Sequence, residues 1–417
     1  SPQDVGSGLQ TTKTVGAQYM RFLGHDFSWF DISSLWNHTN TDDESLSSKQ
    51  TFLYGGDSYQ HSRYKSLGSS DNWTAGSNLC IQKDKYYTIN NLSFSYAHSH
   101  DLNNSNIETS DNQSLLNRML SANSLESRNV DFNLQNRNGI SIIADMIRWN
   151  FGINYNRNTQ KTFSLHDLTY LQHSLPRDYR NQYINRLNQN LKLSAGISYN
   201  WAFRNISLQP EYNYAYSYIK TDNPLYRLDK ISGRDSSLFD RLPSATSILA
   251  TVLDNGNTYH FTEYQNSHQF NFCYRDLHSK LLKCEISVNL PVRIAHANLY
   301  YQRMGRHDVS RQSIFFEPNI WLKGKTWEIK AKMNSEFPDL TTMVNYRDDS
   351  NPMNIILGNT QLRNIHYYDI EGGKTFEGKK HSRLNINTGY HQTDNAVAYS
   401  LVFDKQTGVS TVQPISV

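Results

Sequence analysis

Apolar and polar residues alternate with a period of two through positions 191–219, and a short interruption divides this stretch into two arms. Apolar side chains fill every second place: Leu191, Leu193, Ala195, Ile197, Tyr199 and Trp201, then Ile206, Leu208, Pro210, Tyr212, Tyr214, Tyr216 and Tyr218. Because successive side chains of a β-strand point to opposite faces, this period predicts two strands. A turn at 202–205 would place Trp201 opposite Ile206. Both apolar rows then share one face, and a slip by one residue would separate them.

Both arms exceed the roughly 5–6 residues of ordinary globular strands and approach the roughly 9–11 residues that cross a bilayer at a tilt. The opposite face is polar, with Lys192, Ser194, Ser198, Asn200, Gln209 and Glu211. Such a hairpin suits a sheet between lipid and water, although a long hairpin in a soluble sandwich would show the same alternation. We expect Pro210 to mark a bulge or an unpaired spot, because proline has no backbone N–H to donate.

The pattern recurs along the chain. We predict tight turns at 23–26, 82–85, 136–139, 202–205, 276–280, 323–326 and 376–380, and long polar loops at 37–71, 98–125, 156–186, 221–262 and 335–364. Aromatic residues such as Tyr86, Trp201 and Trp327 lie beside the turns. These features are typical of bacterial outer-membrane barrels. The predicted fold class is all-β: an antiparallel transmembrane β-barrel with short periplasmic turns and long extracellular loops, incomplete in this chain, which holds about 14–15 strands.

Composition narrows the possible functions. The 417 residues carry a formal net charge of +3, and 19% of them are charged. This balance gives no basic surface for nucleic acid. Mean hydropathy is −0.68, and no run approaches the roughly 18 apolar residues of a transmembrane helix. A barrel is the other structure that can span a bilayer, and its polar inner face lowers the mean hydropathy.

The segment 337–364 reads FPDLTTMVNYRDDSNPMNIILGNTQLRN. It resembles a signature of TonB-dependent receptor barrels and, more narrowly, of the outer-membrane β-barrel family common in Bacteroidota. The matching residues are Pro338, Leu340, Asp348, Asp349, Asn351, Pro352, Met353, Ile355, Gly358, Asn359 and Leu362. Thr360 stands where that family usually has proline, and Arg363-Asn364 stand where it usually has lysine and proline.

The resemblance implies a function. Such receptors have barrels of about 22 strands around an internal plug, so we interpret 1–417 as a fragment of the outer-membrane barrel domain without the plug and the closing strands. It would be the wall of a receptor in the Gram-negative outer membrane that actively imports a large nutrient, namely a glycan, a peptide or a metal chelate. Its partners would be membrane lipid, TonB acting through the missing plug, and a surface lipoprotein. A passive porin-like or assembly barrel and a soluble β-rich glycan-binding protein are the alternatives.

Candidate chemistry is sparse. Residues 373–379, GKTFEGK, approach a phosphate-binding loop, but Lys380 stands where that motif needs Ser or Thr. Asp and Asn cluster at 254–257 and 348–351 and could hold Ca²⁺, although turn formation explains both clusters without a metal. We expect no enzyme activity, no cofactor and no metal. As ligand contacts on the predicted outer loop we name Asp348, Asp349, Asn351 and Asn359.

Overall fold

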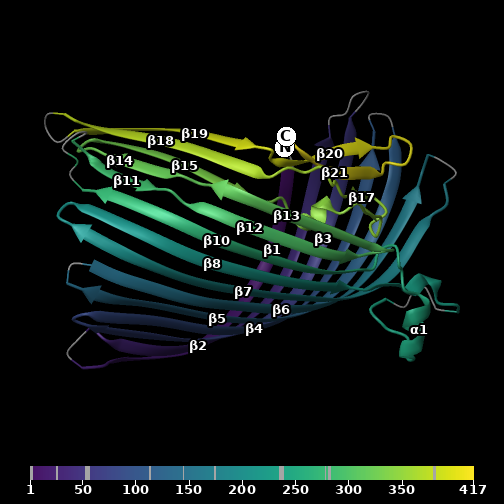
Figure 1. Ribbon diagram of the computed structural model, residues 1–417. Coiled ribbons are helices and arrows are strands. Elements are labelled where there is room, and N and C mark those ends of the chain that lie inside the picture. The colour runs from purple at the N-terminus through teal and green to yellow at the C-terminus, as the bar shows by residue number, and fades with distance from the viewer. Residues whose placement is uncertain are drawn as a thin grey trace.

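The computed structural model describes residues 3–417 except 25–26, 52–56, 112–113, 144, 173–174, 234–238, 278, 280–282 and 379–381. One antiparallel sheet of 17 strands, which we call the wall, dominates the structure (Figure 1). Its strands are β1 (Gln3–Phe22), β2 (Trp29–Thr51), β3 (Ser58–Lys83), β4 (Tyr86–Ser110), β5 (Leu115–Ile142), β6 (Asp145–Tyr170), β7 (Asp178–Phe203), β8 (Ile206–Asn223), β9 (Leu225–Arg227), β10 (Tyr259–Asp276), β11 (Glu285–Asn289), β12 (Val292–Gln302), β13 (Arg306–Phe316), β14 (Asn319–Lys323), β15 (Trp327–Glu336), β18 (Ile365–Glu377) and β19 (Arg383–Asp394).

Helical structure is slight in the described residues. The 3₁₀ turns are η1 (Leu228–Lys230) and η2 (Leu340–Met343), and the α-helix is α1 (Thr246–Thr251). None of these helices is long and apolar enough to cross a membrane.

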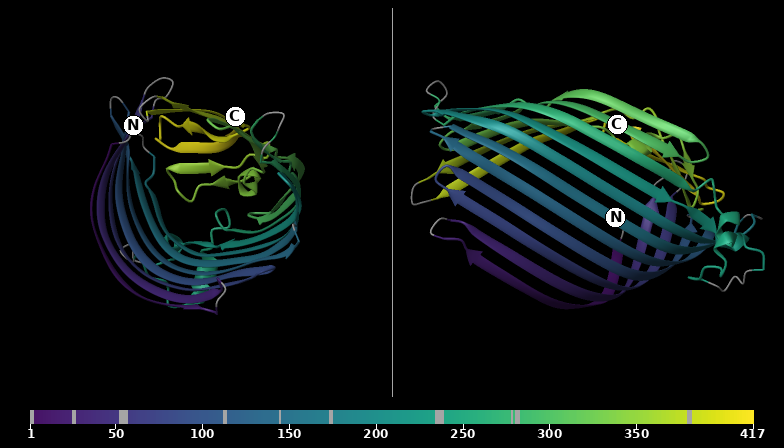
Figure 2. Two further views of the ribbon diagram at one scale, coloured as in Figure 1. Left: turned by 90° about the vertical axis from the view of Figure 1, so that its left-hand side faces the viewer. Right: turned by 60° about the horizontal axis from the view of Figure 1, so that its bottom comes forward.

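Strands that follow one another in the chain are neighbours in the wall. Three rows are interrupted at a proline: β8 and β9 at Pro224, β11 and β12 at Pro291, and β13 and β14 at Pro318. The 17 strands of the described wall therefore make 14 rows, which agrees with the predicted strand number. In this part of the chain β1 pairs with β2 alone and β19 with β18 alone, so the wall curves like a barrel but is not closed (Figure 2).

The two ends of the wall differ. At the turn end, on the left of Figure 1, consecutive strands are joined by short connections such as 84–85 and 204–205. At the opposite end, the hairpin end, paired strands reach far beyond the apolar alternation: Thr51 still pairs with Ser58, and Leu168 with Asp178. The predicted loops 37–71, 98–125 and 156–186 were therefore wrong, because backbone pairing continues after the apolar period stops. The described residues of 221–262 and 335–364 lie largely outside the strands.

The predicted register of the 191–219 hairpin was wrong by two residues, whereas its apolar face is confirmed. Phe203 pairs with Ile206, so the turn is only Arg204-Asn205. The predicted turn at 82–85 shows the same offset, since Lys83 pairs with Tyr86. A shift of two returns every side chain to its own face, so alternation alone cannot separate the two registers.

The turn predicted at 136–139 was also wrong. These residues lie inside β5, and the chain reverses after Ile142, where Ile143 has a φ of 60°. Gly139 has a different role, because a Cβ there would overlap the ring of Tyr87 on the neighbouring strand. The predicted turns at 23–26, 276–280 and 376–380 each include residues outside the described ranges.

Pro210 interrupts pairing on one side of β8. Pairing with β7 stops after Ser198–Glu211 and resumes at Trp201–Leu208, whereas pairing with β10 continues through the proline. The register is the same on both sides of the gap, so no residue is inserted. The expected unpaired spot is confirmed, and it contains no bulge.

A second sheet of four strands lies inside the curve of the wall, as the left view of Figure 2 shows. It consists of β16 (Arg347–Asp348), β17 (Asn354–Leu357), β20 (Val397–Phe403) and β21 (Ser410–Ser416). We call it the inner sheet. With η2 it covers the concave face of the wall near the hairpin end, where buried apolar residues of η2 and of the connections beside it meet those of β5, β6 and β12. The two clusters are Met353 with Met119 and Leu168, and Leu340, Met343, Val344 and Leu362 with Ala297, Leu299 and Tyr301.

Candidate functional site: the concave face and the inward segment

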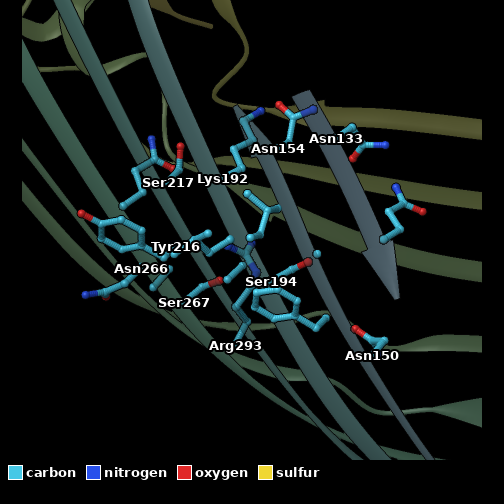
Figure 3. A pocket seen from close by; sticks show the side chains of 18 of the residues that line it. Asn133, Asn150, Asn154, Lys192, Ser194, Tyr216, Ser217, Asn266, Ser267 and Arg293 are labelled. Atoms are coloured by element: carbon cyan, nitrogen blue, oxygen red, sulfur yellow. The ribbon is translucent and has the colours of Figure 1, made fainter. Parts of the chain in front are cut away.

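A hollow of about 580 Å³ lies on the concave face of the wall (Figure 3). Registers place alternate residues of β5, β6, β7, β8, β10 and β12 on this face: Asn133, Gln135, Arg137, Asn150, Asn154, Lys192, Ser194, Ser217, Gln265, Ser267 and Arg293 line it, and Phe337 reaches it from the segment after β15. Each wall residue in this list offers an amide, a hydroxyl or a cation, and the remaining inward positions of the lining are the small residues Gly152, Ala215 and Ala295. The polar face predicted from the alternation is therefore the inner face.

The charged side chains that line this hollow are all cations. Its described lining contains Arg137, Lys192 and Arg293 but no Asp or Glu. Arg293 is neutralised by Glu317 at 2.7 Å and lies over the ring of Phe315, with 4.6 Å between the guanidinium carbon and the ring centroid. Lys192 forms no ion pair with a described residue. The hollow is thus suited to hydrogen-bonding a polar solute, with a preference for one that carries hydroxyl or carboxylate groups.

Segment 337–364, which we call the inward segment, follows β15 at the hairpin end and folds onto the concave face. This agrees with the predicted end of the wall, because β15 leads away from the short connection 324–326. The segment does not project outward as a free loop. Its backbone is anchored on β7, where the guanidinium of Arg180 donates to the carbonyl of Asp349 and the amide of Gln182 donates to the carbonyl of Ser350.

The four predicted ligand contacts all form internal hydrogen bonds. Asp348 accepts from the backbone N–H and hydroxyl of Ser350 at 3.0 and 2.7 Å, and Asp349 accepts from the amide of Asn257 at 2.9 Å. Asn351 accepts from the backbone of residue 353 at 3.0 Å, and Asn359 donates to the carbonyl of residue 414 at 2.8 Å. All four are half-buried. Their position explains how the segment is held, and ligand contact by any of them stays a prediction.

The two Asp/Asn clusters considered for Ca²⁺ meet in space. Both contain Asx turns: Asp254 accepts from the backbone N–H of Gly256 at 3.0 Å, as Asp348 does from that of Ser350. The cation between them is Arg303, whose side chain is only 3% exposed. Within the described residues no group of three His, Cys, Asp or Glu is placed to hold a metal.

Arg303 links the clusters by several contacts. Its guanidinium donates to the carbonyl of Gly256 at 2.6 Å and to the side chain of Asn257 at 2.7 Å, and it lies 3.5 Å from the Asp348 carboxylate. It also lies over the Tyr346 ring, 5.3 Å from the centroid. Burial raises the pKa of Tyr346 to about 12, so this phenol stays neutral. The contacts connect 254–258, the end of β12 and the inward segment in one polar junction.

Sequence reasoning missed Arg303, Arg180 and Arg311, whose side chains all donate to or pair with the inward segment. Arg303 directly follows β12 and continues the row of Ala297, Leu299 and Tyr301 at every second position. A lone arginine at the end of an apolar row can be used to predict a buried polar contact, because a buried guanidinium needs hydrogen-bond acceptors nearby. Those acceptors, however, come from segments about 45 residues away on either side, and alternation gives no information on such contacts.

Comparisons with known proteins do not assign this chain to a family. No family model matches the chain, and no curated protein matches it. Among solved structures, the chain is similar to the ferric citrate transporter FecA in its unliganded form, with 8% identity over 98% of this chain and 77% of that chain. The TM-score is 0.21, which is too low to establish a common fold.

Proposed function

We propose that this chain is the wall of an outer-membrane transporter barrel and, more narrowly, of a TonB-dependent receptor that actively imports a large polar nutrient. The barrel class rests on the two faces of the wall. TonB dependence, a plug, a surface lipoprotein and the nutrient class (glycan, peptide or metal chelate) rest on the resemblance of the inward segment to receptors of this kind.

One observation carries the membrane part of the proposal: an apolar band on the convex face, starting at the turn end. On β6 its outward side chains are Ile147, Trp149, Phe151, Ile153 and Tyr155, and the next outward residue is Arg157. On β8 the band runs from Ile206 to Tyr218, and Lys220 follows. The roughly 9–13 residues of such a band match the roughly 25 Å apolar belt of transmembrane barrels.

Aromatic side chains border this band toward the hairpin end. Trp36, Trp73 and Tyr96 are direct cross-strand partners on β2, β3 and β4, and the rings of Tyr218 and Tyr264 lie 5.2 Å apart on β8 and β10. Rows of Trp and Tyr are the usual interface residues of membrane barrels. The inner face at this level is the polar hollow, as a water-filled or plugged lumen requires.

A labelling experiment tests orientation. Thr360→Cys lies exposed on the inward segment and Lys325→Cys lies exposed at the turn end. With Cys80, Cys273 and Cys284 replaced by Ser, we expect an impermeant maleimide to label Thr360→Cys on intact cells and Lys325→Cys only after the outer membrane is breached. The reverse result would invert the topology of every strand. A chain recovered in the aqueous fraction would instead favour the soluble alternative.

A second experiment tests energy coupling. Cells with and without the complete gene are given labelled oligosaccharides, peptides and ferric chelates, each with and without a protonophore. We expect gene-dependent uptake of one class to stop when the proton gradient is dissipated. Gene-dependent uptake that continues with the protonophore would identify a passive pore and refute the TonB-dependent part of the proposal.

A further inference from the structure

The convex face becomes charged directly beyond the apolar band. On β5 the outward side chains read Phe132, Val130, Arg128 and Glu126 toward the hairpin end. On β6 they read Tyr155, Arg157, Thr159 and Lys161, and registers set Phe132 beside Tyr155, Val130 beside Arg157, and Glu126 beside Lys161. On each of these two strands, the outward residue that follows the last apolar one is therefore a cation.

Two of the cations at this place, Arg128 and Lys161, share the carboxylate of Glu126. Arg128 donates to Glu126 at 2.7 Å, and the Lys161 ammonium lies 3.7 Å from the other oxygen of the same carboxylate. Arg157 is exposed and forms no ion pair with a described residue. The side chains of Arg128 and Lys161 are 55% and 51% exposed, so all three cations are open to solvent or lipid headgroups.

On β8, at the same distance from the turn end, the outward cation is neutralised by a carboxylate. Arg157 pairs with Gln189, and Gln189 pairs with Lys220 on β8, so Arg157 and Lys220 lie in one cross-strand row. Unlike Arg157, Lys220 has a carboxylate of its own, because its ammonium lies 3.3 Å from Asp222. The excess of positive charge is therefore a local feature of β5 and β6.

We propose that Arg128, Arg157 and Lys161 bind the phosphate-bearing headgroup of a membrane lipid. This inference rests on the membrane part of the proposed function. Guanidinium groups bind phosphate oxygens in pairs, and the neighbouring band residues Phe132 and Tyr155 would contact the acyl chains of the same lipid. A soluble anion would use the cations but gain nothing from the band, which is why a lipid is the favoured occupant.

Native mass spectrometry of the complete chain in detergent provides the test, with dioleoylphosphatidic acid as the probe and dioleoylphosphatidylcholine as its matched zwitterionic control. We expect selective retention of the phosphatidic acid. Since a basic residue near a charged lipid surface contributes about 1 kcal/mol, Arg128→Ala with Arg157→Ala should weaken phosphatidic acid binding by about 30-fold. Lys220→Ala, at the same height but already paired, should change it by less than about 2-fold.

Three results would overturn the assignment: equal retention of both lipids, equal loss with Lys220→Ala, or displacement of phosphatidic acid by millimolar inorganic phosphate. The last would show a site for soluble anions. Flotation with pure phosphatidylcholine vesicles separates this from failure of the proposed function. A membrane barrel floats with them whether or not the arginines are present, and all variants must do so before their lipid binding is compared.

Discussion

The wall reverses its polarity between its two ends without a break in the strands. On β12 the residues nearer the turn end, Val292 and Ile294, point outward and are 36% and 38% exposed. Seven residues further along, Tyr301 and its neighbour Leu299 point inward and are 4% and 0% exposed. Near the turn end the apolar side chains are outside, and near the hairpin end they are inside.

The difference shows what each end is adapted to contact. An apolar exterior over a polar interior requires lipid outside and water or a polar domain inside. A polar exterior over an apolar interior is the arrangement of a water-soluble domain with a core. The inward segment supplies the other half of that core, since Leu340, Met343 and Met353 pack on the inward residues of β12, β5 and β6. The chain thus combines a barrel wall with a soluble-type core at one end.

The most severe way to break this comparison is to place a charge in the core at the hairpin end. Leu299→Asp would bury a carboxylate among Ala297, Tyr301 and Leu340. We expect the free energy of unfolding to fall by about 3–5 kcal/mol, because no partner neutralises the charge. Urea titration in phospholipid vesicles measures it. Asn298→Asp, one residue away on the convex face, is the matched control and should change stability by less than about 1 kcal/mol.

The comparison predicts the opposite preference nearer the turn end. Ile197→Arg places a charge on the convex band, where Ile197 is 54% exposed, and should lower the free energy of unfolding by about 2–4 kcal/mol in vesicles. Ser194→Arg on the same strand points into the hollow and should cost much less. Equal losses for the two variants in the same urea titration would mean that lipid does not contact the band.

Two glycines test how tightly each end is packed. A Cβ on Gly358 would overlap the backbone carbonyl of Val344, so Gly358→Ala must displace the inward segment and should cost about 1–3 kcal/mol. A Cβ on Gly196 would meet only the side-chain ends of Asn213 and Asn150 on the polar wall. These can rotate away, and Gly196→Ala should cost less than about 1 kcal/mol. Similar melting temperatures for the two variants would contradict a packed core at the hairpin end.

Local patterns predicted which face each side chain occupies and how many rows the wall has. They did so because the strand period is set by backbone geometry, which every residue of the strand obeys. They failed where two registers place the same side chains on the same face. At Arg204-Asn205, for example, the turn is two residues shorter than expected. They also failed at Gly139, since a glycine that admits a neighbouring ring looks the same in sequence as a turn former.

The inward segment lies at the predicted end of the wall, opposite the short turns, and how it is held there was not predicted. Its anchors include Arg180, Asn257 and Arg303, which lie in other strands or connections. Contacts across such separations depend on how the whole wall curves, and neither alternation nor a local motif encodes that curvature.

The smallest expected effect is a pH dependence of stability that arises in the core at the hairpin end. His166 points to the concave face of β6, opposite Arg180 on β7, with Asp178 nearby. Burial lowers its pKa from 6.5 to about 4, and the positive charge of Arg180 acts in the same direction while Asp178 opposes it. One ring nitrogen lies 2.9 Å from the hydroxyl of Ser164, and the other, Nδ1, has no hydrogen-bond partner.

A lowered pKa means that the folded chain keeps His166 neutral where the unfolded chain would be protonated. The stabilisation is complete above pH 6.5 and is lost progressively as the pH falls toward about 4, because only the unfolded state takes up the proton. Between pH 7 and pH 5 this amounts to no more than about 2 kcal/mol. Thermal melts at both pH values should therefore show a smaller decrease in Tm for His166→Asn than for the unmodified chain. An equal decrease would mean that water reaches His166, and that the concave face at this height is as wet as the polar hollow nearer the turn end.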